Sequence, residues 1–262
     1  MHSPFISDPA VPTQQELVET IIKSLDLLDR ADPSTDHLFS YLYQPHPLLG
    51  DLILKLESYA KIDRPSKSER EDAGRLMEQV AGASFSQLNG VSALKSYQSA
   101  AAQYDLLVSG DTLPWSILTK KLYMNDNRRD ILVEAKARAS KLTDKEFSRV
   151  IGILETHLTI VGLGVFFTLH GATGFPKSES PKRSLGACQL RQVLYYAKTD
   201  KAIIVFNLHD ISSLNRAGAL PKLIARKVRA LSELSGHPFD PSPPPTEVML
   251  PPHISTLLDE KV

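Results

Sequence analysis

The residues with the clearest capacity for chemistry are basic side chains gathered between positions 177 and 229. This segment holds 11 Lys and Arg against 3 Asp and Glu, whereas the whole chain holds 30 of each. Lys and Arg spread over a surface displace counterions from phosphates, and aromatic side chains stack on bases. Tyr195, Tyr196 and Phe206 lie among the basic residues. The segment therefore predicts binding of single-stranded RNA or another polyanion.

The side chains expected to hold phosphates are those of Lys177, Lys182, Arg183, Arg191, Arg216, Lys222, Arg226 and Arg229. A plainer interpretation is that the segment is a solvated face, or that it pairs with the acidic remainder of the same chain. Residues 1–176 carry 18 basic against 22 acidic side chains, and residues 230–262 carry 1 against 5. Both interpretations are open from the sequence alone.

A second group of residues raises the question of catalysis. His209 and Asp210 directly follow an apolar run at 202–208, and His157 and His170 lie in or beside a longer apolar run at 150–169. Histidines and a carboxylate that converge in a pocket can supply a general base or metal ligands. Asp210 can equally cap the helix that follows. A hydrolase that uses His209 and Asp210 is therefore one hypothesis.

The usual enzymatic motifs are missing. The chain has no phosphate-binding loop that ends in Gly-Lys-Ser/Thr, no Gly-x-Ser-x-Gly elbow and no Cys/His set at zinc spacing. The single cysteine, Cys188, excludes an internal disulfide and fits a reducing compartment. We expect no cofactor and no metal, and a role without catalysis is favoured over an enzymatic one.

Nothing in the sequence indicates a membrane protein. The first residues lack the charged and apolar regions of a signal peptide. Glu155 and His157 interrupt the apolar run at 150–169, which leaves too short a stretch to span a bilayer. We therefore expect a cytoplasmic protein without membrane contact.

Apolar periodicity and capping residues predict mostly helices. Thr13 and Glu16 form a capping box that opens a helix ending near Asp32-Pro33, and Ser68 with Glu71, and Thr143 with Glu146, form two more. Other helical stretches are expected at 47–61, 68–81, 91–108, 128–141, 187–198 and 221–235, with a short helix beginning at Pro114-Trp115. The run at 202–208 is the best candidate for a strand, and its partner is either 164–169 or a strand of another subunit.

The predicted fold is mainly α, a two-lobed helical core with at most a minor β element near 202–208; the alternative is α+β. An extended arm at 1–12 precedes an N-terminal helical lobe at 13–125. A C-terminal helical lobe at 126–236, which includes the basic segment, precedes a Pro-rich tail at 237–262.

The function that the sequence favours is an RNA-binding assembly protein of nucleocapsid or coat type. Its basic face would hold phosphates, and its extended arms would link subunits into a homo-oligomer. One alternative is a helical adaptor or effector that binds another protein, and the hydrolase is the second alternative.

Overall fold

The structure is a computed structural model that describes residues 32–98, 103–174 and 186–235, together with single positions between 13 and 24. Residues 36–239 belong to one compact unit. The predicted arm at 1–12, Lys177, Lys182 and Arg183 of the basic segment, and the tail at 237–262 lie outside the described residues.

Eight helices and five strands have defined bounds within the described ranges. In chain order these are α2 (Asp32–Leu42), α3 (Leu49–Tyr59), α4 (Lys67–Phe85), β1 (Ala93–Gln98), β2 (Gln103–Ser109), α5 (Leu113–Lys121), β3 (Asp130–Lys136), α6 (Asp144–Thr156), β4 (Val161–Thr168), α7 (Ala187–Thr199), β5 (Ala202–Phe206), α8 (Leu208–Ser212) and α9 (Ala219–Ser235).

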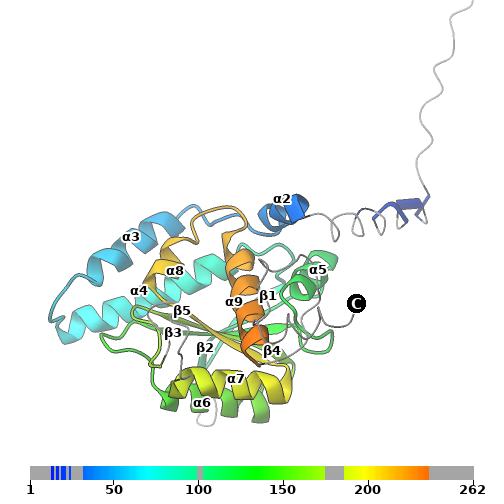
Figure 1. Cartoon of the computed structure of the whole chain (residues 1–262). Helices are drawn as coiled ribbons and strands as arrows, with labels where there is room; N and C mark the ends of the chain where they lie inside the picture. The colour runs from blue at the N-terminus through cyan, green and yellow to red at the C-terminus, as the bar shows by residue number, and fades with distance from the viewer. Residues whose placement is uncertain are drawn as a thin grey trace, which may run out of the picture. The chain divides into compact units, whose positions relative to one another are not determined.

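The five strands form one mixed sheet in the order β1-β2-β3-β4-β5. β1, β2 and β3 are an antiparallel meander, and β4 and β5 extend it as parallel neighbours of β3. α6 and α7 connect the parallel strands. Figure 1 shows α6 and α7 on one side of the sheet, and α3, α4 and α8 on the other.

The strands in the parallel half are buried on both faces, and so their side chains divide between two apolar clusters. In β4, Leu163, Val165 and Phe167 join the cluster that includes α3, α4 and α9. Phe166 faces the opposite way and packs on Phe147 of α6, with ring centroids 5.2 Å apart. This alternation gives three layers, with helices on both faces of the sheet.

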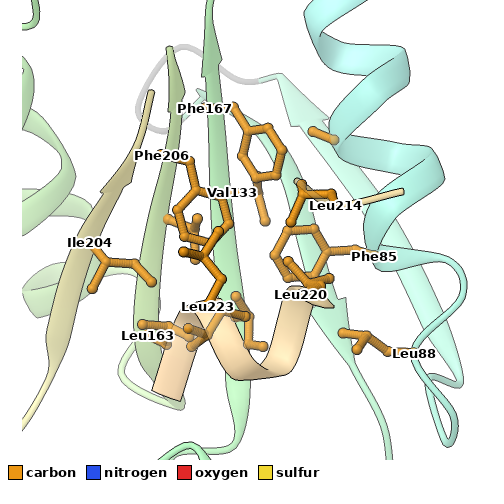
Figure 2. Close-up of a cluster of buried hydrophobic side chains, with 14 of the residues drawn as sticks. Phe85, Leu88, Val133, Leu163, Phe167, Ile204, Phe206, Leu214, Leu220 and Leu223 are labelled. Atoms are coloured by element: carbon orange, nitrogen blue, oxygen red, sulfur yellow. The ribbon is translucent and has the colours of Figure 1, made fainter. Parts of the chain in front are cut away.

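The larger cluster is centred on aromatic side chains from three elements. The ring of Phe167 lies 6.0 Å from that of Phe85 in α4 and 5.2 Å from that of Phe206 in β5. Figure 2 shows these rings together with Leu220 and Leu223 of α9. Each of the three phenylalanines is fully buried, so the cluster joins α4 and α9 to the middle of the sheet.

The prediction of a mainly α, two-lobed helical core is wrong, because a five-stranded mixed sheet forms the centre of an α/β fold. β1 and β2 come from residues before position 125, and β3, β4 and β5 come from residues after it. Strands from both sides of the predicted lobe boundary therefore belong to the same sheet.

Two predicted helices are strands. Residues 91–108 contain β1 and most of β2, and residues 128–141 contain β3. Ala and Leu are common in helices, but the fit of a side chain to a pleated, buried surface overrides that propensity. In β3 the run Ile131-Leu132-Val133 is buried on both faces, and the polar residues around it resemble the polar face of a helix.

Most other predicted elements are confirmed. Thr143 and Glu146 form the predicted capping box, α3 and α7 match their predicted ranges, and β5 pairs with β4. The capping box of α4 uses Ser66 and Glu69 instead of Ser68 and Glu71. α2 begins at Asp32 with Pro33 in its first turn, where a proline is tolerated. Residues 25–31, where the preceding predicted helix would end, lie outside the described residues.

Among the helices of the described residues, none combines the length and the apolarity that crossing a bilayer requires.

We expect Phe167→Ala to lower the free energy of unfolding by about 3–5 kcal/mol, because the lost ring leaves a cavity between α4 and β5. Urea unfolding measures this change. Leu194→Ala on α7 is the control, since Leu194 is 59% exposed and its loss should change stability by less than about 0.5 kcal/mol. Equal effects of the two substitutions would contradict the packing described for this cluster.

Candidate active site

A group of charged side chains lies at the carboxyl end of β3, the middle strand of the sheet. Glu134 and Lys136 are two residues apart in this strand, and so they point to the same face. The ladder pairs Leu106 of β2 with Val133 of β3, which puts Asp105 opposite Glu134. The register of the sheet thus brings together three charged residues from two strands.

Lys136 links the two carboxylates. Its Nζ lies 2.9 Å from Oε2 of Glu134 and 3.1 Å from Oδ2 of Asp105. The backbone N–H of Ala135 donates to the same oxygen of Asp105 at 2.7 Å, which holds that side chain against β3. From α6, Nη1 of Arg149 donates to Oε2 of Glu134 at 3.1 Å. The group has a defined geometry because backbone and side-chain donors orient both carboxylates.

Glu134 is almost completely buried, with 1% of the residue exposed. Its Oε2 accepts from two cations, but its Oε1 is buried and has no hydrogen-bond partner among the residues that the structure describes. A buried polar atom without a partner is unfavourable by about 1–3 kcal/mol, more when it carries charge. Such a group needs an explanation other than stability, and a bound ligand is one.

The ionisation of this group follows from its contacts. Burial disfavours the charged form of Lys136, but Glu134 and Asp105 together outweigh it, so the pKa of Lys136 is raised. The charged group also affects Glu78 of α4. Burial and the negative charge of Asp105 raise the pKa of the Glu78 carboxyl. Lys136 is therefore an ammonium at neutral pH, and it serves as a fixed positive charge and not as a base.

A first cavity, of about 470 Å³, opens beside Lys136. It lies between Arg70 and Gly74 of α4 and the segment from Ala135 to Ser140, which ends β3 and enters the following loop. The cavity reaches the charged group at Lys136, whereas Asp105 and Glu134 are not among its lining residues, and Arg70 and Arg138 add two cations to its wall. Arg138 also pairs with Glu146 at 2.7 Å.

Two carboxylates beside a cavity can supply ligands to a divalent cation that an anionic substrate also binds. Mg²⁺ is usually held in proteins by one or two carboxylates, water and the phosphates of its substrate. Asp105 and Glu134 supply such a pair. Within the described residues, no cluster of three or more His, Cys, Asp and Glu side chains forms a ready metal site. A cation at this place would therefore depend on substrate oxygens to complete its coordination.

The structure distributes the predicted phosphate-holding residues over α7, α9 and the loop before α9. Arg191 of α7 pairs with Asp144 of α6, and Nη2 of Arg191 lies 2.7 Å from Oδ2 of Asp144. On α9, Arg226 lies 3.9 Å from Asp210 and Arg229 lies 3.2 Å from Glu233. Lys222 is also on α9, and Arg216 is exposed in the loop before it. Three of these cations therefore face carboxylates of the same chain.

The histidines of the hydrolase hypothesis do not all meet. His157 follows α6 before β4 begins, and His170 lies just beyond the other end of β4. Asp210 forms a capping box with Asn207 at the start of α8, and it pairs with Lys227 at 2.9 Å. Asp210 thus has the capping role that the sequence left open, and His209 beside it is exposed.

No protein-family model, no curated protein and no solved structure matches this chain.

Sequence reasoning missed Asp105, Glu134 and Lys136. The signal that was present is Glu134-Ala135-Lys136 at the end of an apolar run. In a helix, Glu134 and Lys136 would point about 200° apart, whereas in a strand they share a face. The prediction of a helix at 128–141 therefore concealed the pair.

We expect Lys136→Met to lower the free energy of unfolding at neutral pH by about 3 kcal/mol, since it leaves the half-buried Asp105 without its cation and the buried Glu134 with Arg149 alone. Urea unfolding of both proteins checks this value. An unchanged stability would show that the carboxylates do not depend on Lys136.

The same variant yields a pH dependence with a definite sign. The folded protein holds the proton of Lys136 more tightly than the unfolded chain, whose ordinary pKa is 10.5. The stability that this ion group contributes is complete below about pH 10.5 and is lost as pH rises through the higher folded pKa. As pH rises through the folded pKa of Lys136, the free energy of unfolding should fall more for wild type than for Lys136→Met. If the difference in unfolding free energy between the two proteins did not change with pH, the raised pKa would be contradicted.

Proposed function

We propose that this protein hydrolyses phosphodiester bonds of a nucleic acid with the help of a divalent cation held by Asp105 and Glu134. The observation that carries the proposal is the buried Oε1 of Glu134, which has no partner in the described parts of the chain. It belongs to a carboxylate that is fixed by Lys136 and Arg149 at the end of the central strand. A free carboxylate oxygen in such a place is suited to a metal ligand.

The chemistry assigned to each residue follows from its charge. A divalent cation bound here would polarise the phosphate and make an attacking water more acidic. Lys136 keeps its proton at neutral pH, and so it stabilises the negative charge that develops on the phosphate oxygens. Asp105, held by the backbone N–H of Ala135, and Glu134, held by Arg149, keep their oxygens in place.

The reaction is a displacement at phosphorus. The oxygen of a water molecule forms a new bond to phosphorus, and the bond from phosphorus to the leaving ester oxygen breaks. The leaving oxygen takes up a proton, and the other product is a phosphate monoester. No oxidant, reductant or organic cofactor is needed.

A polyanionic substrate is supported by the cations around the opening. Arg70 lines the first cavity and Lys141 follows its last lining residue, Ser140. Neither cation has an ion pair within the ranges that the structure describes. Unpaired cations are available to phosphates, whereas Arg191, Arg226 and Arg229 already face carboxylates. The proposed path of the strand therefore runs past Arg70 and Lys141.

The prediction of RNA binding is consistent with this proposal, because a nuclease must hold the phosphates of its substrate. The assembly role of nucleocapsid or coat type depends on the segments at 1–12 and 237–262, which lie outside the described residues. That role stays a prediction, as does the protein-binding adaptor.

We expect the purified protein to cleave single-stranded RNA or DNA when Mg²⁺ or Mn²⁺ is added, and to stop when EDTA removes the cation. Asp105→Asn and Glu134→Gln should each reduce the cleavage rate by at least about a hundredfold, because an amide replaces a charged ligand while the shape is kept. Gel analysis of labelled oligonucleotides measures the rate.

The control for this experiment is Asp126→Asn, which removes a carboxylate that pairs with Arg129 on the surface and should leave cleavage unchanged. Circular dichroism shows whether each variant is folded. If folded wild type cleaves neither RNA nor DNA with either metal, the charged group is structural and the proposal is wrong.

The binding path can be tested without catalysis. In the presence of EDTA, replacing Arg70 and Lys141 by Ala should weaken single-stranded RNA binding. The salt dependence of the binding constant should become less steep by the amount expected for the loss of about two phosphate contacts. The matched pair Arg191→Ala and Arg229→Ala should have a smaller effect, because these side chains face Asp144 and Glu233. A larger effect of the Arg191 and Arg229 substitutions would contradict the proposed path and would support RNA binding by the basic segment.

A further inference from the structure

A second cavity, of about 460 Å³, lies at the carboxyl ends of the parallel strands β4 and β5. Its lining residues are Lys141, His170, Gly171, Ala172, Gln189, Gln192, Ile204, Val205, Asn207, Lys227, Ala230, Leu231 and Leu234. Ligands in open α/β sheets commonly bind outside the carboxyl ends of parallel strands. The volume also lies within the ordinary range of small-molecule sites.

The two cavities are neighbours. Residues 137–140 line the first cavity and Lys141 lines the second, so one short segment after β3 borders both. This segment follows β3, and His170 and Asn207 follow β4 and β5. Both cavities therefore open at the same edge of the sheet.

Part of the wall of the second cavity is apolar. Ile204 and Val205 contribute from β5, and Ala230, Leu231 and Leu234 contribute from α9. Ile204 and Leu231 also belong to the larger apolar cluster, and Val205 belongs to the smaller one on the other face of the sheet. A ligand between β5 and α9 would need a flat or compact apolar body.

Amide groups lie between these walls. Gln189 of α7 is 8% exposed, and no hydrogen bond of its side chain is found in the described parts of the chain. The amide of Gln192 instead donates to the carbonyl of Ile203 at the outer edge of β5. The inner part of the cavity thus holds an amide that can both donate and accept a hydrogen bond.

The cations lie further out. Lys141 and His170 are exposed, and Lys227 is half-buried, with its Nζ 2.9 Å from Asp210. Lys141 has no ion pair within the described ranges. Charge therefore increases from the interior of the cavity to its mouth, which suits a ligand with an apolar, hydrogen-bonding body and an anionic end.

We propose that the second cavity binds a nucleotide, with its base between β5 and α9 and its phosphate at Lys141 and His170. A base is a flat group with donors and acceptors on its edge, which the amide of Gln189 can read. A fatty acid would leave this buried amide without a partner. The choice of a nucleotide rests on the proposed nuclease function, since the ligand is either a free mononucleotide or one unit of the bound strand.

The test is titration calorimetry of the full chain in EDTA with AMP, GMP, CMP and UMP, and with adenosine and inorganic phosphate as partial ligands. At least one monophosphate should bind at least about tenfold more tightly than adenosine or phosphate alone, because it uses both parts of the cavity. The absence of binding for all four monophosphates at millimolar concentration would overturn the inference.

Variants locate the binding. Ala230→Phe should fill the cavity from an exposed position on α9 and weaken monophosphate binding by at least about tenfold. Gln189→Leu should weaken it by about tenfold through loss of the amide. Ala197→Phe is the matched control, since Ala197 is exposed on α7 and does not line the cavity. Equal binding by Ala230→Phe and Ala197→Phe would place the nucleotide elsewhere and overturn the inference.

The failure of this inference is distinguishable from that of the nuclease. Glu134→Gln should abolish cleavage and keep monophosphate binding. If the cavity holds a free mononucleotide, Ala230→Phe should weaken monophosphate binding and keep cleavage. If the cavity instead holds one unit of a strand, a single-stranded oligonucleotide should displace the bound monophosphate, and Ala230→Phe should raise the KM for cleavage. Binding of monophosphates without any cleavage would support the cavity and contradict only the nuclease.

Discussion

The burial of β3, β4 and β5 on both faces is the constraint on which the rest of this structure depends. A parallel strand cannot return by a short turn, so a helix must connect each strand to the next. α6 and α7 provide those connections, and the opposite face needs α3, α4, α8 and α9 to exclude water. The aromatic contacts of Phe167 with Phe85 and Phe206 are a consequence of this arrangement.

The same constraint creates the places where chemistry can occur. Because β3, β4 and β5 run in one direction, their carboxyl ends meet at one edge of the sheet, and the segments that follow them lie together. The charged group of Glu134 and Lys136 and the cavity beside His170 both lie at this edge. The layers that bury the strands also surround these charges, which strengthens their mutual attraction and makes an unpaired oxygen more unfavourable.

The folded chain pairs some of the basic residues that are concentrated in one segment of the sequence. Along the sequence, basic residues are concentrated between 177 and 229, and acidic residues lie elsewhere. In the folded chain, Arg191 faces Asp144 and Lys227 faces Asp210. Arg191 and Asp144 are distant in sequence, whereas Lys227 and Asp210 both belong to the basic segment. Arg70 and Lys141, which have no ion pair within the described ranges, lie near the end of β3, and Arg216 of the basic segment is exposed in the loop before α9.

The sequence by itself determined the elements whose signals are local. The capping box of Thr143 and Glu146 and the apolar face of α9 depend on residues within a few turns of one helix, and both predictions hold. Lys227, which falls toward the apolar side of α9, is explained by Asp210 and by the ring of Phe206, 5.9 Å from its Nζ. Only the tertiary structure decided that 91–108 and 128–141 are strands, because burial between two helical layers outweighs the helical propensity of their residues. It also decided the site, since Asp105 meets Glu134 and Lys136 through the register of β2 against β3, and no local pattern specifies that register.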